Sequence, residues 1–296
     1  MTTIPTTILI SSSNDRLLAI HSGYSIKMKI RRRAILVVAL TQFFAFCRGQ
    51  EKPAASAQEL ADKLSNPVAN LISVPFQNNV DYGIGPHKGS KYTLNFQPVI
   101  PIQLNPKLNL VTRYVIPIVD QRDITAENTD EFGLSDATIS AWFSPVHSKS
   151  GLLWGAGPAF LVPIGTNDFL STRKWAIGPT VLALRQATGL TYGFLVNQLW
   201  SFAGDENRSD VNQMFLQPFL SKSWKSGASV TMNSEITFNW ENNTTSAYLN
   251  PIVSAVTKLG KQAVSLSVGP RIPLGGPEAT MADWGLRAAL TLAFPK

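Results

Sequence analysis

The stretch DWGLRAALTLAF, residues 283–294, decides the fold and lies close to the end of the 296-residue chain. Its side chains alternate in polarity. One face carries Trp284, Leu286, Ala288, Leu290, Leu292 and Phe294, and the other carries Gly285, Arg287, Ala289, Thr291 and Ala293. Alternation at a period of two predicts a β-strand with one apolar face and one more polar face. Such a strand suits either a membrane barrel or a soluble sandwich, so the other strands must decide between them.

Eleven other segments repeat this alternation, which makes twelve predicted strands after residue 70. In 227–240, for example, Thr231 and Asn233 alternate with Val230 and Met232. Segments of about ten residues that alternate in polarity between turn residues are typical of membrane strands. The predicted strands are 71–82, 91–104, 107–119, 133–144, 152–164, 175–185, 189–201, 212–223, 227–240, 247–259, 262–273 and 283–294.

The connections between these strands alternate in length. Those at 105–106, 186–189, 224–227 and 260–261 are short, and those at 120–132, 165–174, 202–211, 241–246 and 274–282 are longer and polar. Short periplasmic turns and longer extracellular loops are expected of an outer-membrane barrel, with both chain ends in the periplasm. The sequence therefore predicts an all-β fold: a transmembrane antiparallel up-and-down β-barrel of about twelve strands.

The last strand resembles the closing strand of bacterial outer-membrane barrels, because it is apolar and has Phe294 near its end. Pro295 and Lys296 follow that aromatic residue, whereas the family usually ends on it. The resemblance implies that the outer-membrane assembly machinery is a partner of this strand.

The positive charge of the chain is concentrated in residues 1–49. They carry +6 of the formal net charge of +7, and the remainder is almost neutral. The basic pI of about 9.5 therefore does not indicate a nucleic-acid partner. Lys29 and residues 31–33 precede an apolar run, 34–46, that is too short to span a bilayer. We predict that Met28 is the true start and that a secretory signal peptide is cleaved near Gly49.

Cys47 is the only cysteine, and it lies in this leader. The mature chain is therefore expected to lack disulfides, thiolate catalysis and cysteine-bound metals. Lipidation of Cys47 is the less favoured alternative, because bulky Phe46 precedes it.

Residues 50–70 are predicted to be a short periplasmic helical segment ahead of the barrel, which occupies 71–296. Ser56 and Glu59 have the spacing of a capping box, and Leu60 and Leu64 lie on one helical face. The sequence leaves open whether this segment enters the lumen.

Seven tryptophans are predicted to form two membrane girdles, since the amphipathic indole favours the bilayer interfaces. The outer girdle comprises Trp175, Trp200, Trp240 and Trp284, and the periplasmic girdle comprises Trp142, Trp154 and Trp224. Prolines lie inside several predicted strands, and each removes a ladder hydrogen bond; among them are Pro98, Pro117, Pro158, Pro179, Pro218, Pro251 and Pro270. The Gly–Pro pairs at 157–158, 178–179 and 269–270 predict bulges or kinks there.

The stretch NPVANLISVPFQNNVDYGIGP, residues 66–86, with Gln97–Pro98, residues 114–117 and residues 155–158, resembles one family of bacterial outer-membrane proteins. Its members are described as transporters or as proteins of the meta-pathway of phenol degradation, and some are misnamed neuromedin U. The resemblance covers about residues 59–296. It implies a barrel with presumed transport activity and no catalytic residues.

Polar residues on the inward face of the predicted strands are the candidate pore lining. They are Arg113, Glu235, Arg271, Arg287, Asn95, Gln97, Asn197, Gln217 and Asn239. An Arg that faced lipid at mid-depth would be unfavourable by about 2–4 kcal/mol, so these charges are expected to point inward. Inside, they form either a salt-bridge network that fills a narrow barrel or a polar path that favours anionic groups.

Histidine is scarce: His87 is predicted in an outer loop and His147 in a periplasmic turn. Neither has a serine and an acid beside it on a strand, and no pair has metal-ligand spacing. The sequence predicts no enzyme, cofactor or metal site.

The predicted function is passive uptake of a small solute, with aromatic or hydrophobic compounds among the candidates, across the outer membrane of a Gram-negative bacterium. Outer-membrane lipid and lipopolysaccharide are the other expected partners. The alternatives are a plugged structural or adhesive barrel that acts through its outer loops and, less favoured, a membrane-embedded hydrolase. A soluble secreted sandwich is the last alternative.

Overall fold

The computed structural model of the chain describes residues 56–146, 151–260 and 262–295. The predicted signal peptide, Cys47 and His147 lie outside these residues. The chain divides into two units, Met1–Gln50 and Glu51–Lys296, and every described residue belongs to the second unit. No helix among the described residues is long and apolar enough to cross a bilayer.

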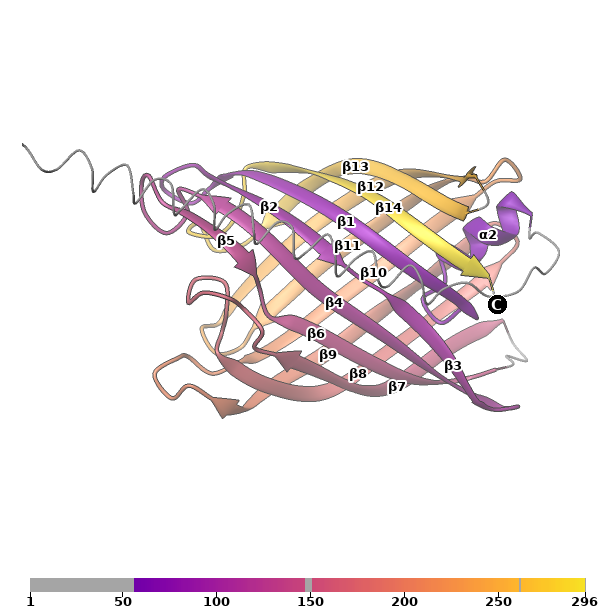
Figure 1. The fold of residues 1–296 in the computed structure, drawn as a ribbon, viewed down its shortest axis with the longest axis horizontal. Helices are drawn as coiled ribbons and strands as arrows, with labels where there is room; N and C mark the ends of the chain where they lie inside the picture. The colour runs from indigo at the N-terminus through magenta and orange to yellow at the C-terminus, as the bar shows by residue number, and fades with distance from the viewer. Residues whose placement is uncertain (1–55, 147–150, 261, 296) are drawn as a thin grey trace, which may run out of the picture. The chain divides into compact units, whose positions relative to one another are not determined.

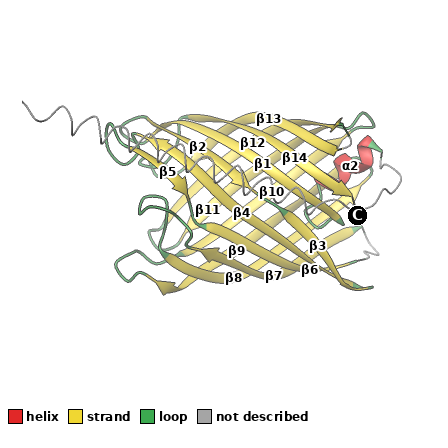
Figure 2. Ribbon diagram, viewed as in Figure 1, coloured by secondary structure: helices red, strands yellow, loops and turns green. Residues whose placement is uncertain are grey.

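The second unit is a closed antiparallel β-barrel with one short helix at the end where β14 finishes (Figures 1 and 2). We call this the periplasmic end and the opposite one the outer end, after the orientation that the sequence predicts. Helix α2 covers Ala57–Leu64. The strands are β1 (Leu71–Ile84), β2 (Gly89–Phe96), β3 (Val99–Asn105), β4 (Leu108–Arg122), β5 (Asp130–Leu134), β6 (Ala137–Pro145), β7 (Leu152–Val162), β8 (Lys174–Ala187), β9 (Leu190–Gly204), β10 (Asn212–Ser223), β11 (Ala228–Asn239), β12 (Thr244–Leu259), β13 (Gln262–Gly275) and β14 (Trp284–Pro295). The barrel closes where β1 pairs with β14, from Leu71 opposite Pro295 to Tyr82 opposite Trp284.

The barrel has the predicted twelve strand positions, because two of the predicted strands are each broken into two pieces. The strands β2 and β3 share the position between β1 and β4, and β5 and β6 share the next position. The first break falls at Pro98, which has no N–H for the ladder. There, Gln97 N donates to Pro75 O over 3.0 Å, and Tyr114 N donates to Pro98 O over 3.0 Å. The wall therefore stays joined across the break.

The second break falls at Asp136, whose carboxylate anchors the loop between β7 and β8. It accepts hydrogen bonds from Gly165 N, Ser171 Oγ, Thr172 N and Thr172 Oγ1 at 2.6–3.2 Å. These four donors satisfy the hydrogen-bonding needs of the buried carboxylate. Asp136 therefore lies outside the strand ladder, and its hydrogen bonds hold the β7–β8 loop against the end of β5.

No bulge forms at the Gly–Pro pairs, contrary to the first of the two predicted irregularities. The ladders skip pairs beside Pro158, Pro179 and Pro270, but the same register resumes beyond each proline. The glycines instead allow close approach of the next strand. A Cβ on Gly157, Gly178 or Gly269 would overlap the carbonyl oxygen of Ala141, Gln198 or Pro251, respectively. Each Gly–Pro pair thus replaces hydrogen bonds by tight backbone packing.

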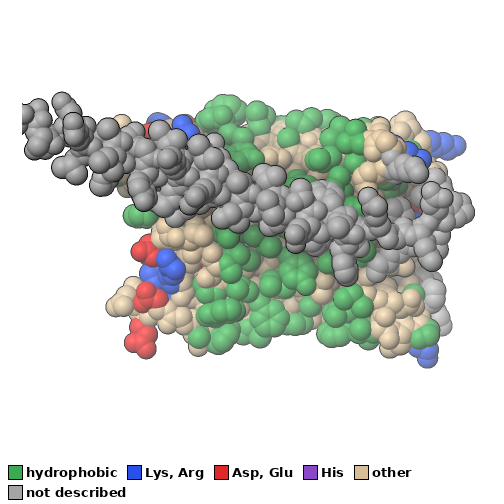
Figure 3. Space-filling model, viewed as in Figure 1, with side chains coloured by type: hydrophobic (Ala, Val, Ile, Leu, Met, Phe, Trp, Pro, Cys, Tyr) green, Lys and Arg blue, Asp and Glu red, His purple; other side chains and the backbone are tan. Residues whose placement is uncertain are grey.

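The outer face of the barrel is a hydrophobic band with charged side chains gathered at its two ends (Figure 3). Large apolar side chains from strands all around the wall are exposed, including Ile102, Phe194, Met232, Val253 and Leu266. A soluble protein would rarely expose such an area of apolar surface, whereas lipid covers it.

Six of the seven tryptophans are exposed on this outer face near strand ends: Trp154, Trp175, Trp200, Trp224, Trp240 and Trp284. Trp284 stacks on Tyr82 with ring centroids 4.7 Å apart, and Trp240 Nε1 donates to Gln198 Oε1 over 3.0 Å. Their exposure to the surroundings of the barrel is what a girdle residue requires.

Trp142 is not a girdle residue, contrary to the prediction. It is fully buried inside the barrel, where it packs with Val111, Leu182 and Leu195. Its Nε1 donates to Thr180 Oγ1 over 3.1 Å. The alternation of β6 explains the position, because Trp142 shares a face with Ser140 and Ser144, which are buried, whereas Phe143 on the other face is exposed.

Candidate solute site in the barrel lumen

A cavity of about 500 Å³ occupies the lumen, and eight of the nine predicted lining residues border it. These eight are Asn95, Gln97, Arg113, Asn197, Gln217, Glu235, Arg271 and Arg287. The ninth, Asn239, lies apart. Its Oδ1 accepts hydrogen bonds from Glu241 N and Asn242 N at 3.0 and 3.3 Å, so it caps the outer turn between β11 and β12.

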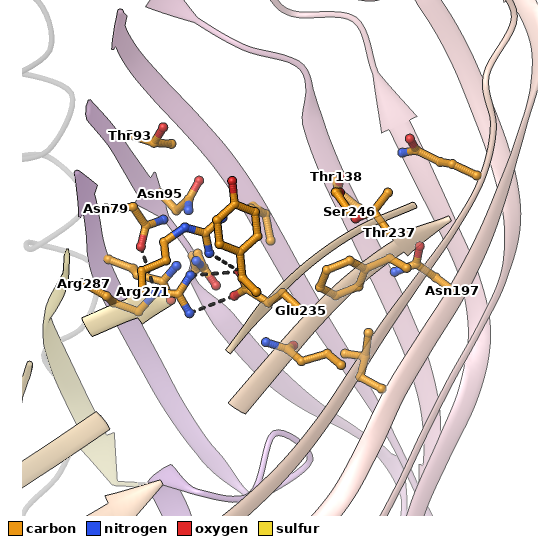
Figure 4. A pocket seen from close by; sticks show the side chains of 18 of the residues that line it. Asn79, Thr93, Asn95, Thr138, Asn197, Glu235, Thr237, Ser246, Arg271 and Arg287 are labelled. Carbon is orange, nitrogen blue, oxygen red and sulfur yellow. Dashed lines mark hydrogen bonds and ion pairs between the residues drawn. The ribbon is translucent and has the colours of Figure 1, made fainter. Parts of the chain in front are cut away.

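Glu235 is the centre of a charged cluster in this cavity, to which Arg271 and Arg287 both donate (Figure 4). Arg287 forms a forked pair with it, with Nη1 2.8 Å from Oε1 and Nη2 2.9 Å from Oε2. Arg271 Nη1 lies 2.6 Å from Oε2, and Arg271 Nε lies 3.0 Å from Asp81 Oδ1. The guanidinium of Arg271 also lies over the ring of Tyr248, 3.7 Å from its centroid. This cluster is the salt-bridge network that the sequence offered as one of two alternatives.

This network leaves a cavity open in the lumen, and the charges that line the cavity do not sum to zero. Four cationic side chains, Lys91, Arg113, Arg271 and Arg287, and two carboxylates, Asp81 and Glu235, border the cavity. The lining therefore carries a formal charge of +2, in a space with low-dielectric walls that strengthen its field.

Sequence reasoning missed Asn79, Asp81, Lys91 and Tyr248 as lining residues. Asn79 Oδ1 accepts from Arg287 Nε over 2.8 Å, which orients this arginine toward Glu235. A signal for β1 existed, because Gln77, Asn79 and Asp81 recur at a period of two and share the inner face.

The segment from α2 to Pro67 lies across the periplasmic end of the lumen. A second cavity, of about 260 Å³, is bordered by residues 63–67 and by wall residues such as Arg113 and Gln217. Gln186 Nε2 donates to Asp62 O over 2.6 Å, and Ser223 Oγ donates to Asp62 Oδ1. Leu60 packs with Leu71 and Ala293 at the closure between β1 and β14. The helix is thus bound to both sides of the mouth, and it narrows this end.

The helix itself is formed as predicted. Ser56 is its N-cap and accepts from Glu59 N over 3.1 Å, and Lys63 Nζ lies 2.7 Å from Glu59 Oε1. The hydrogen bond from Lys63 and its positive charge lower the pKa of Glu59. Local signals therefore define α2, while its place in the mouth depends on contacts with distant strands.

The outer loops are tied to one another by charged contacts. Arg208 Nη2 donates to Asp168 O over 2.6 Å, and Lys174 Nζ lies 2.9 Å from Asp210 Oδ1. The Lys174 hydrogen bond, together with one from Ser201, lowers the pKa of Asp210. His87, in the loop between β1 and β2, has its Nδ1 3.6 Å from Glu127 Oε1, so its nearest charged partner is a carboxylate in another loop.

Solved structures of other proteins resemble this barrel. The COG4313 outer membrane channel from Pseudomonas putida F1 aligns with a TM-score of 0.59 at 13% sequence identity, over 76% of this chain and 94% of that one. The chain has the fold of an outer-membrane β-barrel. Outer membrane phospholipase A from Escherichia coli aligns with a TM-score of 0.44 at 10% identity, over 81% of this chain and 98% of that one. No protein-family model and no curated protein matches the sequence.

Proposed function

We propose that this barrel is a passive outer-membrane channel for a small solute. The observation that carries the proposal is the polar, charged cavity of about 500 Å³ inside a wall whose outer face is apolar. A cavity of this volume accommodates a small organic molecule. The Pseudomonas putida F1 protein of the same fold is an outer membrane channel, which adds support by likeness of fold alone.

The lining favours a solute that carries a polar group. A purely hydrophobic molecule would separate the charged side chains from water without offering them hydrogen bonds, which is unfavourable. The resemblance to outer-membrane proteins of phenol degradation favours an aromatic solute, and a polar aromatic compound meets both conditions. We further propose outer-membrane lipid and lipopolysaccharide as surroundings of the wall, and β14 as the strand recognised by the assembly machinery.

Liposome swelling tests the proposal. The chain from Gln50 onward, refolded into liposomes, is expected to speed the entry of small sugars and amino acids over protein-free liposomes. Asn197→Trp places an indole in the cavity and is expected to slow entry. Val196→Trp, one residue along on the opposite face of β9, is the matched control and is expected to leave entry unchanged. Swelling no faster than in protein-free liposomes would refute the channel.

A plugged barrel that acts through its outer loops is the second candidate, and one observation favours it. The segment from α2 to Pro67 narrows the periplasmic mouth and is held there by Gln186 and Ser223. Normal folding without solute entry, even after this segment is deleted, would favour that candidate over the channel.

A further inference from the structure

Five residues border both lumen cavities and thus mark the passage between them: Gln77, Gln97, Arg113, Leu195 and Gln217. Arg113 is the only charged member of this set. A solute that moved from the outer cavity toward the periplasm would pass its guanidinium. Arg113 therefore lies where a single side chain can select among solutes.

Arg113 differs from the other two lumen arginines in its partners. Arg271 and Arg287 are paired with Glu235, and Arg271 also with Asp81. In the described part of the chain, no carboxylate oxygen lies within 4.0 Å of the Arg113 guanidinium. Its Nη2 donates to the neutral amide oxygen of Gln97 over 2.7 Å. Since a guanidinium has five N–H donors in a fixed fork, donors remain for an anion in the passage.

Gln97 holds Arg113 in place rather than neutralising it. Gln97 is itself buried, and its backbone N donates to Pro75 O at the break between β2 and β3. The break thus fixes a neutral amide beside the guanidinium. The Arg113 charge thus has a neutral hydrogen-bond partner, and Glu235 acts on it only from beyond ion-pair distance.

Strands β9 and β10 bring apolar side chains to the passage, beside the polar Asn197 and Gln217. They lie four and five strand positions along the sheet from β4, which carries Arg113. Leu195 and Leu199 on β9 are buried, and Phe215 on β10 borders the outer cavity while Phe219 borders the periplasmic one. A solute in the passage therefore meets both the Arg113 guanidinium and the apolar side chains that β9 and β10 contribute.

We propose that Arg113 binds the carboxylate of a small amphipathic organic anion whose apolar body packs against Leu195 and Phe215. Guanidinium and carboxylate groups match in charge and in planar geometry, and apolar contact with β9 and β10 fixes the orientation of the ligand. This inference rests on the proposed channel function and specifies the class of solute.

Binding of benzoate tests this site without requiring transport. Isothermal titration calorimetry of benzoate into the refolded chain from Gln50 onward, with protein-free micelles as the blank, is expected to show binding. Arg113→Gln is expected to weaken it at least tenfold. Arg122→Gln, on the same strand but with a side chain 68% exposed at the outer end, is expected to bind like the wild type. Benzyl alcohol, which has the ring but no carboxylate, is expected to bind at least tenfold more weakly than benzoate.

Heat-dependent gel mobility identifies the folded variants, and Arg113→Lys keeps the charge in case Arg113→Gln does not fold. Arg113→Lys is expected to bind benzoate more weakly than the wild type and, where both variants fold, more tightly than Arg113→Gln. Equal benzoate affinity in wild type and folded Arg113→Gln or Arg113→Lys would overturn the proposal, as would equal affinity for benzyl alcohol. Absence of benzoate binding to the folded wild type, with liposome swelling intact, would overturn the anion site alone. Benzoate binding without swelling would support the site and refute the channel.

Discussion

Replacing Glu235 by glutamine tests how much the lumen network contributes to stability. The change removes the carboxylate that pairs with Arg271 at 2.6 Å and with Arg287 at 2.8 Å. Arg287 is only 3% exposed, so its charge would remain in the lumen without an ionic partner. Removal of one partner from a buried ion pair destabilises a protein by about 3–5 kcal/mol. We therefore expect Glu235→Gln to lower the free energy of unfolding by about 3 kcal/mol or more.

Urea unfolding of the refolded barrel, followed by tryptophan fluorescence, measures this change. Glu241→Gln, in the exposed outer turn after β11, is the matched control and is expected to change the free energy by less than about 0.5 kcal/mol. Adding Arg287→Gln to Glu235→Gln is expected to restore part of the loss, because the unpaired charge is then gone. A loss below about 1 kcal/mol in Glu235→Gln would refute the reasoning, since the network would then be as weak as an exposed ion pair.

Three further substitutions probe the wall and the periplasmic mouth. Trp142→Ala is expected to lower the free energy of unfolding by about 3–5 kcal/mol in the same urea titration, because it empties part of the packed interior; a loss typical of an exposed residue would contradict the buried position. Gly178→Ala is expected to destabilise the barrel by about 1–3 kcal/mol, because its Cβ would overlap Gln198 O. Gly275→Ala, where a Cβ meets nothing within 4 Å, is its control, and equal urea midpoints for the two would refute the close-approach account. Gln186→Ala removes the donor to Asp62 O and is expected to speed tryptic cleavage at Lys63, measured by mass spectrometry; an unchanged rate would show that this contact does not hold α2.

Much of the wall could be predicted from the sequence because strand alternation is a local property. The predicted strand 212–223 coincides with β10, and the closing strand differs from β14 by one residue at each end. The breaks at Pro98 and Asp136 were not predicted. The first depends on hydrogen bonds to Pro75 and Tyr114 on neighbouring strands, and the second depends on a loop some 30 residues away. Such partners are set by the closure of the barrel and leave no local trace.

Part of the lumen lining could also be predicted, because strand alternation is a local property. The alternation of each strand is enough to turn Arg113 and Glu235 inward. Which charges meet is not local: Arg271 pairs with Asp81 through the register that β1, β14 and β13 adopt when the sheet closes. The nearness of Trp142 to a strand end predicts a girdle position, but its alternation with Phe143 places it on the inner face, and alternation determines the face on which a strand residue lies.

Single-channel recording in a planar bilayer tests the central claim, that the lumen is a path for solutes, most directly. The chain from Gln50 onward, and a variant that lacks residues 51–66, would be recorded side by side. We predict discrete conductance steps for the chain from Gln50 onward. We predict larger steps for the variant without residues 51–66, because residues 63–67 border the periplasmic cavity. Folded, heat-modifiable protein that gives no conductance in either form would contradict the account, and the charged lumen would then have a structural role alone.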